Sequence, residues 1–116
     1  MKLLWLSNAP WTATGYGQQT RIFTPMVRDA GYDVAIAASH GLAGDRLTWE
    51  GMTVYPQGFD AYGNDIMVPW ALEHFGGDVD SGWLFTLYDA WVFRNPELKK
   101  LHHAVWVPVD HNPIPT

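Results

Sequence analysis

The chain has 116 residues, the length of one domain, and 47% of them are apolar while 16% are charged, as in a globular protein rather than a disordered one. Its net charge of −5 argues against a nucleic-acid partner, because binding to phosphates needs a basic face. The lack of cysteine excludes a disulfide scaffold and a thiolate metal site, and it fits a cytoplasmic location. No apolar run approaches the roughly 20 residues that cross a bilayer.

The first twenty residues predict the entry unit of an α/β domain. The apolar run 3–6 indicates a buried strand, and Gly15 and Gly17 then allow a tight turn and a close approach to a ligand. Apolar residues at helical spacing follow, and Gly31 is placed to end that helix. The start of the helix offers N–H groups to an anion such as a phosphate. A tight turn that binds nothing is the alternative, because Thr20 replaces the third glycine of a dinucleotide fingerprint and no P-loop is present.

Residues 33–39 are small and continuously apolar, which predicts a parallel strand covered on both faces. Two short apolar segments, 47–49 and 52–55, flank Glu50-Gly51 and predict a hairpin with a two-residue turn. A helix is predicted over 66–75, with Asn64 or Asp65 as its N-cap.

The last third of the chain predicts a strand at 83–88, a helix that begins at Asn95-Pro96, and a strand at 104–109 before a proline-rich tail. Helices between apolar strands predict a doubly wound, Rossmann-like parallel sheet in three layers, with segments 3–7, 33–39, 83–88 and 104–109 adjacent. Because no helix follows the last strand, we expect a truncated domain with an uncovered sheet face and a tendency to self-associate.

Polar residues follow each predicted strand, and ligands of open parallel sheets bind outside the carboxyl ends of the strands. His111, placed after the last strand, is suited to hydrogen-bond a sugar hydroxyl or to act as a base, and Asp89 and Asp110 are suited to similar work. The alternative is that these side chains stabilise their own turns. The other histidines near helices, His74, His102 and His103, are expected at the surface, and no metal site is expected.

Four stretches resemble the start of glycosyltransferases of the GT-B fold, most closely the retaining group known as group 1 or family 4. The likeness covers nearly the whole chain. It is carried by Leu4-Trp5-Leu6-Ser7-Asn8-Ala9-Pro10-Trp11 with Thr14-Gly15-Tyr16-Gly17-Gln18-Gln19-Thr20, by Asp29-Ala30-Gly31-Tyr32-Asp33-Val34, by Thr86-Leu87-Tyr88-Asp89-Ala90-Trp91-Val92, and by Trp106-Val107-Pro108-Val109-Asp110-His111-Asn112-Pro113-Ile114-Pro115.

The resemblance implies that the chain is the acceptor-side half of a two-domain enzyme that takes a sugar from a nucleotide-diphosphate sugar. It implies that Gly15, Tyr16, Gly17 and Gln18 approach the substrates. It places His111 near the transferred sugar. Asp89 and Asp110 match positions in the family's motifs, and we expect Asp89 to be catalytic and Asp110 to bind substrate.

The family's second domain, which holds the nucleotide-sugar, has no counterpart in these 116 residues. We therefore expect no transfer by the chain alone. The expected partners are the sugar acceptor, the second domain and a second copy of the chain. Two other hypotheses remain open. In the first, the chain is a self-sufficient module that binds a phosphorylated ligand at residues 15–17. In the second, it is an interaction module whose tryptophans bind a protein.

Overall fold

The computed structural model describes residues 1–59, 64–78, 80–87 and 101–106. Six strands form one sheet: β1 (Lys2–Asn8), β2 (Asp33–His40), β3 (Leu47–Trp49), β4 (Met52–Tyr55), β5 (Gly82–Leu87) and β6 (His103–Trp106). Two helices, α1 (Gly15–Asp29) and α2 (Met67–His74), connect them. The strand order is β3-β4-β2-β1-β5-β6, a Rossmann-like α/β arrangement that is parallel except for β3.

The four strands predicted to be parallel neighbours are confirmed, because β1 lies between β2 and β5, and β6 lies next to β5. The predicted hairpin is also confirmed. Its two turn residues have positive φ, 53° at Glu50 and 77° at Gly51, as a tight turn between antiparallel strands requires. The sequence did not reveal that β4 would extend the parallel sheet by pairing with β2.

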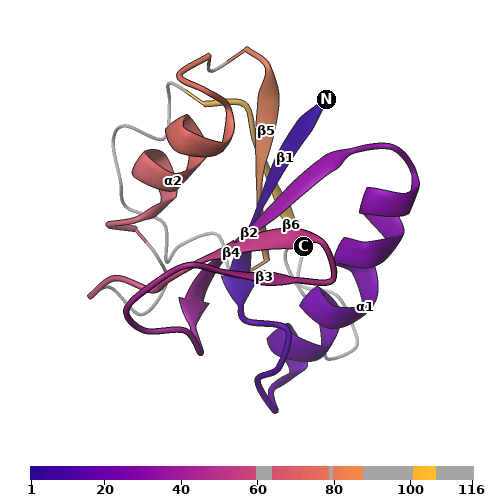
Figure 1. Ribbon diagram of the computed structural model, residues 1–116, viewed down its shortest axis with the longest axis vertical. Coiled ribbons are helices and arrows are strands. Elements are labelled where there is room, and N and C mark those ends of the chain that lie inside the picture. The colour runs from indigo at the N-terminus through magenta and orange to yellow at the C-terminus, as the bar shows by residue number, and fades with distance from the viewer. Residues whose placement is uncertain (60–63, 79, 88–100, 107–116) are drawn as a thin grey trace, which may run out of the picture.

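The two helices lie on opposite faces of the sheet, so the described part of the domain has three layers (Figure 1). On one face, α2 packs against alternate residues of the strands, among them Leu4, Leu6 and Leu84. On the other face, α1 packs against the intervening residues, such as Trp5 and Ile36. This alternation follows from the period of two in a strand, and a sheet covered on both sides accounts for the continuous apolar runs in the sequence.

The ends of both helices are set by local sequence. Gly31 (φ 105°) follows α1, as predicted, and Gly76 and Gly77, also with positive φ, follow α2. The expectation for the start of α2 was wrong: the N-cap is Ile66, without a side-chain hydrogen bond. Asp65 instead accepts a hydrogen bond from the Phe59 amide (2.6 Å) and so closes the loop before the helix.

Neither helix of the described residues has the length and apolar character needed to span a lipid bilayer. The predicted helix from Asn95, the end of the last predicted strand and the tail at 110–116 lie outside the described residues.

Candidate functional site

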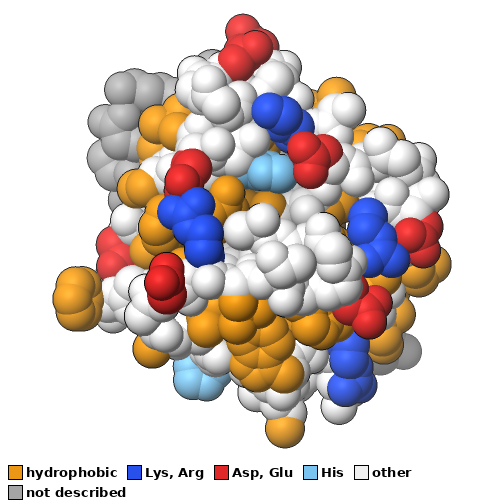
Figure 2. Space-filling model, in the orientation of Figure 1, with side chains coloured by type: hydrophobic (Ala, Val, Ile, Leu, Met, Phe, Trp, Pro, Cys, Tyr) orange, Lys and Arg blue, Asp and Glu red, His pale blue; other side chains and the backbone are white. Residues whose placement is uncertain are grey.

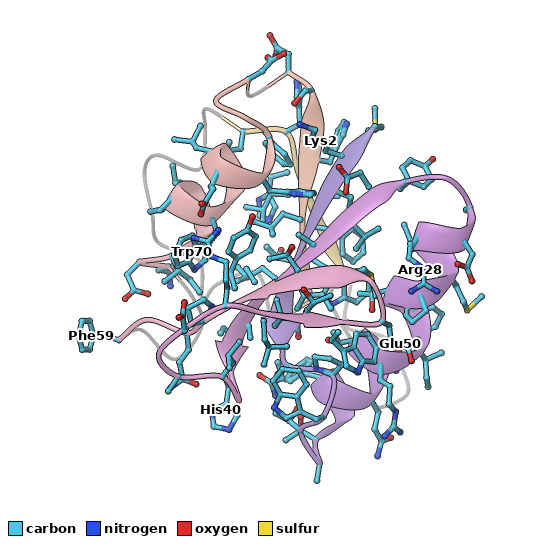
Figure 3. The ribbon with its side chains drawn as sticks, viewed as in Figure 1. Lys2, Arg28, His40, Glu50, Phe59 and Trp70 are labelled. Atoms are coloured by element: carbon cyan, nitrogen blue, oxygen red, sulfur yellow. The ribbon has the colours of Figure 1, made fainter. Side chains whose placement is uncertain are left out.

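The carboxyl edge of the sheet collects the loops that follow β1, β2 and β4, which are neighbours in the sheet. In Figure 3, His40 marks this edge and Lys2 marks the opposite one. The chain leaves β1 toward β2 through α1, and it later returns from β4 through α2 to β5 on the other side of β1. Strand order therefore reverses at β1, which is where open α/β sheets bind their ligands.

The loop between β1 and α1 is held by its own hydrogen bonds. The Ala9 amide donates to the carbonyl oxygen of His40 (2.8 Å), which joins the end of β1 to the end of β2. The Ala9 carbonyl oxygen in turn accepts from both the amide (3.1 Å) and the hydroxyl (2.8 Å) of Thr12. Ala9 is fully buried, so the base of the loop belongs to the packed interior.

Thr14 caps the amino end of α1 and connects it to β1. Its hydroxyl oxygen accepts from the Gly17 amide (3.0 Å) and from the side-chain amide of Asn8 (2.8 Å). Its proton points to Thr12 Oγ1 (3.3 Å), because the Thr12 proton is already donated to Ala9. The Gly15 amide makes no hydrogen bond within the described part of the chain, and so remains available to a ligand at the helix start.

The two glycines of the predicted binding loop have different roles. A Cβ on Gly17 would overlap the Thr12 side chain and lie 2.5 Å from the Thr12 carbonyl oxygen, so this glycine is needed for the loop to pack on the helix. A Cβ on Gly15 would meet nothing within 4 Å. Gly15 is therefore the glycine whose replacement changes the approach of a ligand without disturbing the loop.

A third glycine, Gly41, completes the packing from the β2 side. It has a φ of 103°, and an added Cβ would lie 2.5 Å from the Thr12 methyl group and 2.9 Å from the Ala9 methyl group. The loop after β1 is thus enclosed between Gly17 of α1 and Gly41 at the end of β2.

Hydrogen bonds link the three loops of this edge into one continuous surface. The indole N–H of Trp11 donates to the Gly41 carbonyl oxygen (2.8 Å), while the Gly41 amide donates to Gln57 Oε1 (3.0 Å). The Gln57 amide donates to the carbonyl oxygen of Leu42 (2.7 Å). Beyond Gln57, the side chain of Phe59 is fully exposed and projects away from the body of the protein (Figure 3).

In the described loops after β1, β2 and β4, the one Arg or Lys is paired and the other charged side chains are acidic. The guanidinium of Arg46 binds both carboxylate oxygens of Glu73 (2.8 and 3.0 Å) and lies 5.0 Å from the centre of the Tyr55 ring. The hydrogen bond to Glu73 raises the pKa of Arg46, and burial raises the pKa of Tyr55. Figure 2 shows the same pattern over the visible face, where basic and acidic side chains lie beside one another.

The structure brings four of the predicted site residues to the first turn of α1: Gly15, Tyr16, Gly17 and Gln18. Gln18 is exposed, whereas Tyr16 is half-buried and packs against the core on the α1 face. The other predicted site residues, Asp89, Asp110 and His111, lie outside the described residues.

Sequence reasoning missed three residues that shape this edge: Trp11, Thr14 and Gly41. A threonine immediately before a predicted helix is a recognised cap signal, so the capping role of Thr14 could have been predicted from the sequence. Gly41 followed a predicted strand without any pattern that showed its contacts. Its role depends on the register that places the end of β2 beside the end of β1.

The three histidines near helices all have partners. The ring of His74 lies 2.9 Å from the Asp33 carbonyl oxygen, and His102 lies 3.2 Å from Asp80. The surface expectation was wrong for His103, which is half-buried and bonds through Nε2 to the Thr86 hydroxyl (2.7 Å). Burial lowers the pKa of His103. Within the described ranges, no group of three or more acidic or histidine side chains is arranged to hold a metal ion.

Compared with models of known protein families, with curated proteins and with solved structures, the chain matches none.

Proposed function

We propose that this chain is the acceptor-side domain of a glycosyltransferase that uses a nucleotide-diphosphate sugar and retains the anomeric configuration. The observation that carries the proposal is the enclosed loop between β1 and α1, fixed at the carboxyl edge where strand order reverses. The resemblance of the Trp5–Trp11 and Thr14–Thr20 stretches to GT-B transferases supplies the activity. The structure supports this with a loop held by its own hydrogen bonds, beside which an added Cβ on Gly15 would meet no atom within 4 Å.

Glycosyl transfer with retention needs stabilisation of a cationic sugar and of a departing diphosphate in the same step. The described loops of this edge hold one Arg or Lys, Arg46, and that guanidinium is committed to Glu73. Asp45 and Asp65 add negative charge. A surface on which acidic side chains outnumber free basic ones favours a neutral acceptor over a diphosphate. The donor is therefore best held by a second domain that faces this one.

In this proposal His111 and Asp89 contribute to catalysis, and Asp110 and Gln18 contact the substrates. These roles come from the family resemblance, with Gln18 exposed on the first turn of α1 beside Gly15. No metal ion is part of the proposed mechanism.

A second candidate is an interaction module, and the exposed Phe59 favours it. A fully exposed aromatic ring at a loop tip is typical of a contact with another protein surface. The same ring is equally suited to contact a donor domain across a cleft, so the two functions are separated by an activity test. The phosphorylated-ligand module is less favoured, because the one Arg or Lys of the described loops after β1, β2 and β4, Arg46, is paired with Glu73.

The test begins with the coding sequence that follows Thr116, expressed as one protein with residues 1–116 and assayed for transfer from a panel of nucleotide-sugars. We expect a second Rossmann-type domain and donor-dependent transfer, with none from residues 1–116 alone. In the longer protein, replacing Gly15 by Ala should leave most of the activity, while Gly15→Leu and Gly15→Trp should lower it progressively. Full transfer by residues 1–116 alone, or activity unchanged by Gly15→Trp, would contradict the proposal.

A further inference from the structure

Trp11 combines high exposure with a fixed orientation. It exposes 43% of its surface at the carboxyl edge, yet its indole N–H is held by the Gly41 carbonyl oxygen at 2.8 Å. The loop that carries it is enclosed between Gly17 and Gly41, whose missing side chains leave the space that Thr12 fills. The ring is therefore presented to solvent in one position rather than swinging freely.

The hydrogen bond to Gly41 also decides how a ligand contacts this residue. Because the donor of the indole is used within the protein, the exposed surface consists of ring carbon atoms. The faces of such a ring carry partial negative charge and attract the partly positive C–H groups of a flat, weakly polar surface. The C–H face of a pyranose sugar has this character, and its rim of hydroxyls matches polar groups placed around an aromatic platform.

One polar side chain suited to a sugar hydroxyl lies at the same edge of the sheet. His40 precedes Gly41 and its exposed imidazole projects from the same edge (Figure 3).

The charge of this edge distinguishes a neutral sugar from a phosphorylated compound. Arg46 is paired with Glu73, and the remaining described acids of these loops, Asp45 and Asp65, repel anions. A nucleotide stacked on Trp11 would bring its phosphates to the described loops after β1, β2 and β4, where the one Arg or Lys, Arg46, is paired with Glu73.

We propose that the exposed ring of Trp11 is the stacking platform for an uncharged pyranose. This makes an unphosphorylated glycoside, rather than a sugar phosphate or phospholipid, the acceptor class of the transferase. The acceptor assignment rests on the proposed function, whereas the binding of the sugar to Trp11 does not.

The test is a titration of the isotope-labelled chain with methyl glucopyranoside, methyl galactopyranoside and methyl mannopyranoside up to about 50 mM, since single stacking contacts give millimolar affinity. The observed signals are the indole N–H resonance of Trp11, assigned from the Trp11→Phe variant, and the backbone amide resonances of Thr12 and Gly41, which report binding in the variants that lack the indole. We expect at least one glycoside to shift this resonance, and Trp11→Ala to weaken its binding about tenfold or more.

Trp83 offers a matched control. It is 39% exposed, but it lies on β5 in register with Leu3 near the amino edge, and its ring packs on His102 at 5.2 Å. Trp83→Ala should leave glycoside binding unchanged. Inorganic phosphate and a nucleoside monophosphate form the second arm, and neither should bind at Trp11 more tightly than the glycoside.

Four outcomes would overturn the site: no glycoside shifts Trp11, Trp83→Ala weakens binding as much as Trp11→Ala, a phosphate compound binds there more tightly, or Trp11→Phe folds but does not bind. The Phe variant keeps an aromatic face, so it decides the matter if Trp11→Ala does not fold. Failure of the proposed function is distinguished by the transfer assay. Glycoside binding without transfer would support the sugar site at Trp11 and contradict the transferase function. Transfer that Trp11→Ala does not affect would contradict the sugar site alone.

Discussion

The two helices cover the two faces of the sheet with different chemistry. The buried residues of α2 are apolar, Met67 and Ala71, and they join a cluster with Leu4, Leu6 and Phe75. The buried residues of α1 are small or hydroxylated: Gly17, Thr20 and Thr24. Thr20 accepts a hydrogen bond from the indole of Trp5 (3.1 Å) and donates one to the Tyr16 carbonyl oxygen (3.0 Å).

The difference indicates a division of roles between the faces. Apolar burial under α2 stabilises the domain but tolerates small shifts, because it has no preferred direction. Small residues and a directed hydrogen bond under α1 fix where the helix lies on the sheet, and α1 carries the candidate binding loop at its amino end. Apolar burial stabilises the domain on both faces, and on the α1 face a directed hydrogen bond also fixes the position of the site.

The largest expected effect lies on the α2 face. Phe75 is 1% exposed, and replacing it by Ala should lower the free energy of unfolding by about 3–5 kcal/mol, as for other buried Phe→Ala changes. Phe23 of α1 is only partly buried, so Phe23→Ala should cost about half as much. Denaturant unfolding of the two variants measures both values, and a larger loss for Phe23→Ala would reverse the comparison.

The glycines at the start of α1 give the next effect. Gly17→Ala places a methyl group against the Thr12 backbone and should cost about 1–3 kcal/mol of stability while displacing the loop. Gly15→Ala meets no atom and should be neutral or stabilise by up to ~1 kcal/mol, since alanine restricts the unfolded chain. Thermal unfolding measures the stability of each variant, and the indole resonance of Trp11 reports whether the loop is displaced. Equal stability of the two variants would show that the loop does not pack as described.

The hydroxyls under α1 provide a finer test. Thr20→Val removes the acceptor of the Trp5 indole and should cost about 1–2 kcal/mol. Thr24 is equally buried, but its hydroxyl bonds to the Thr20 carbonyl oxygen (2.6 Å) of its own helix, so Thr24→Val should cost less. Chemical denaturation measures both variants. If Thr24→Val cost as much as Thr20→Val, the hydrogen bond between Trp5 and Thr20 would contribute no more to stability than a bond within the helix.

Much of this fold was predictable because the strands are short, apolar and bounded by turn residues. The runs at Leu4 and Ala35 are buried on both faces, so a continuous apolar stretch carried the information. Glu50-Gly51 defined its hairpin by turn chemistry alone. The N-cap of α2 was not predictable, because Asp65 accepts instead from the Phe59 amide, six residues earlier in the preceding loop.

The candidate site was predictable in place but not in detail. The rule for parallel sheets located it at the carboxyl ends of the strands. The separate roles of Gly15 and Gly17 depend on where Thr12 lies, and the indole of Trp11 depends on a bond to a residue 30 positions away. Contacts between distant segments follow from the strand register, which a single sequence does not specify.

The smallest expected effect concerns a pair of hydrogen-bonded polar side chains on the α2 face. His103 bonds to the hydroxyl of Thr86, which alternates with Leu84 and is fully buried. Burial lowers the pKa of His103 below 6.5, so the unfolded chain takes up this proton first as the pH falls. Stability should therefore decrease as the pH drops from about 6.5 toward the lower pKa of the folded state, and it should be unaffected by this group above that range. Unfolding free energies of the parent chain and of His103→Gln across pH 5–8 isolate the contribution, because the variant lacks the titrating ring. The decrease on acidification should be shallower in the variant, and an equal or steeper decrease would show that the α2 face does not disfavour a charge at this position.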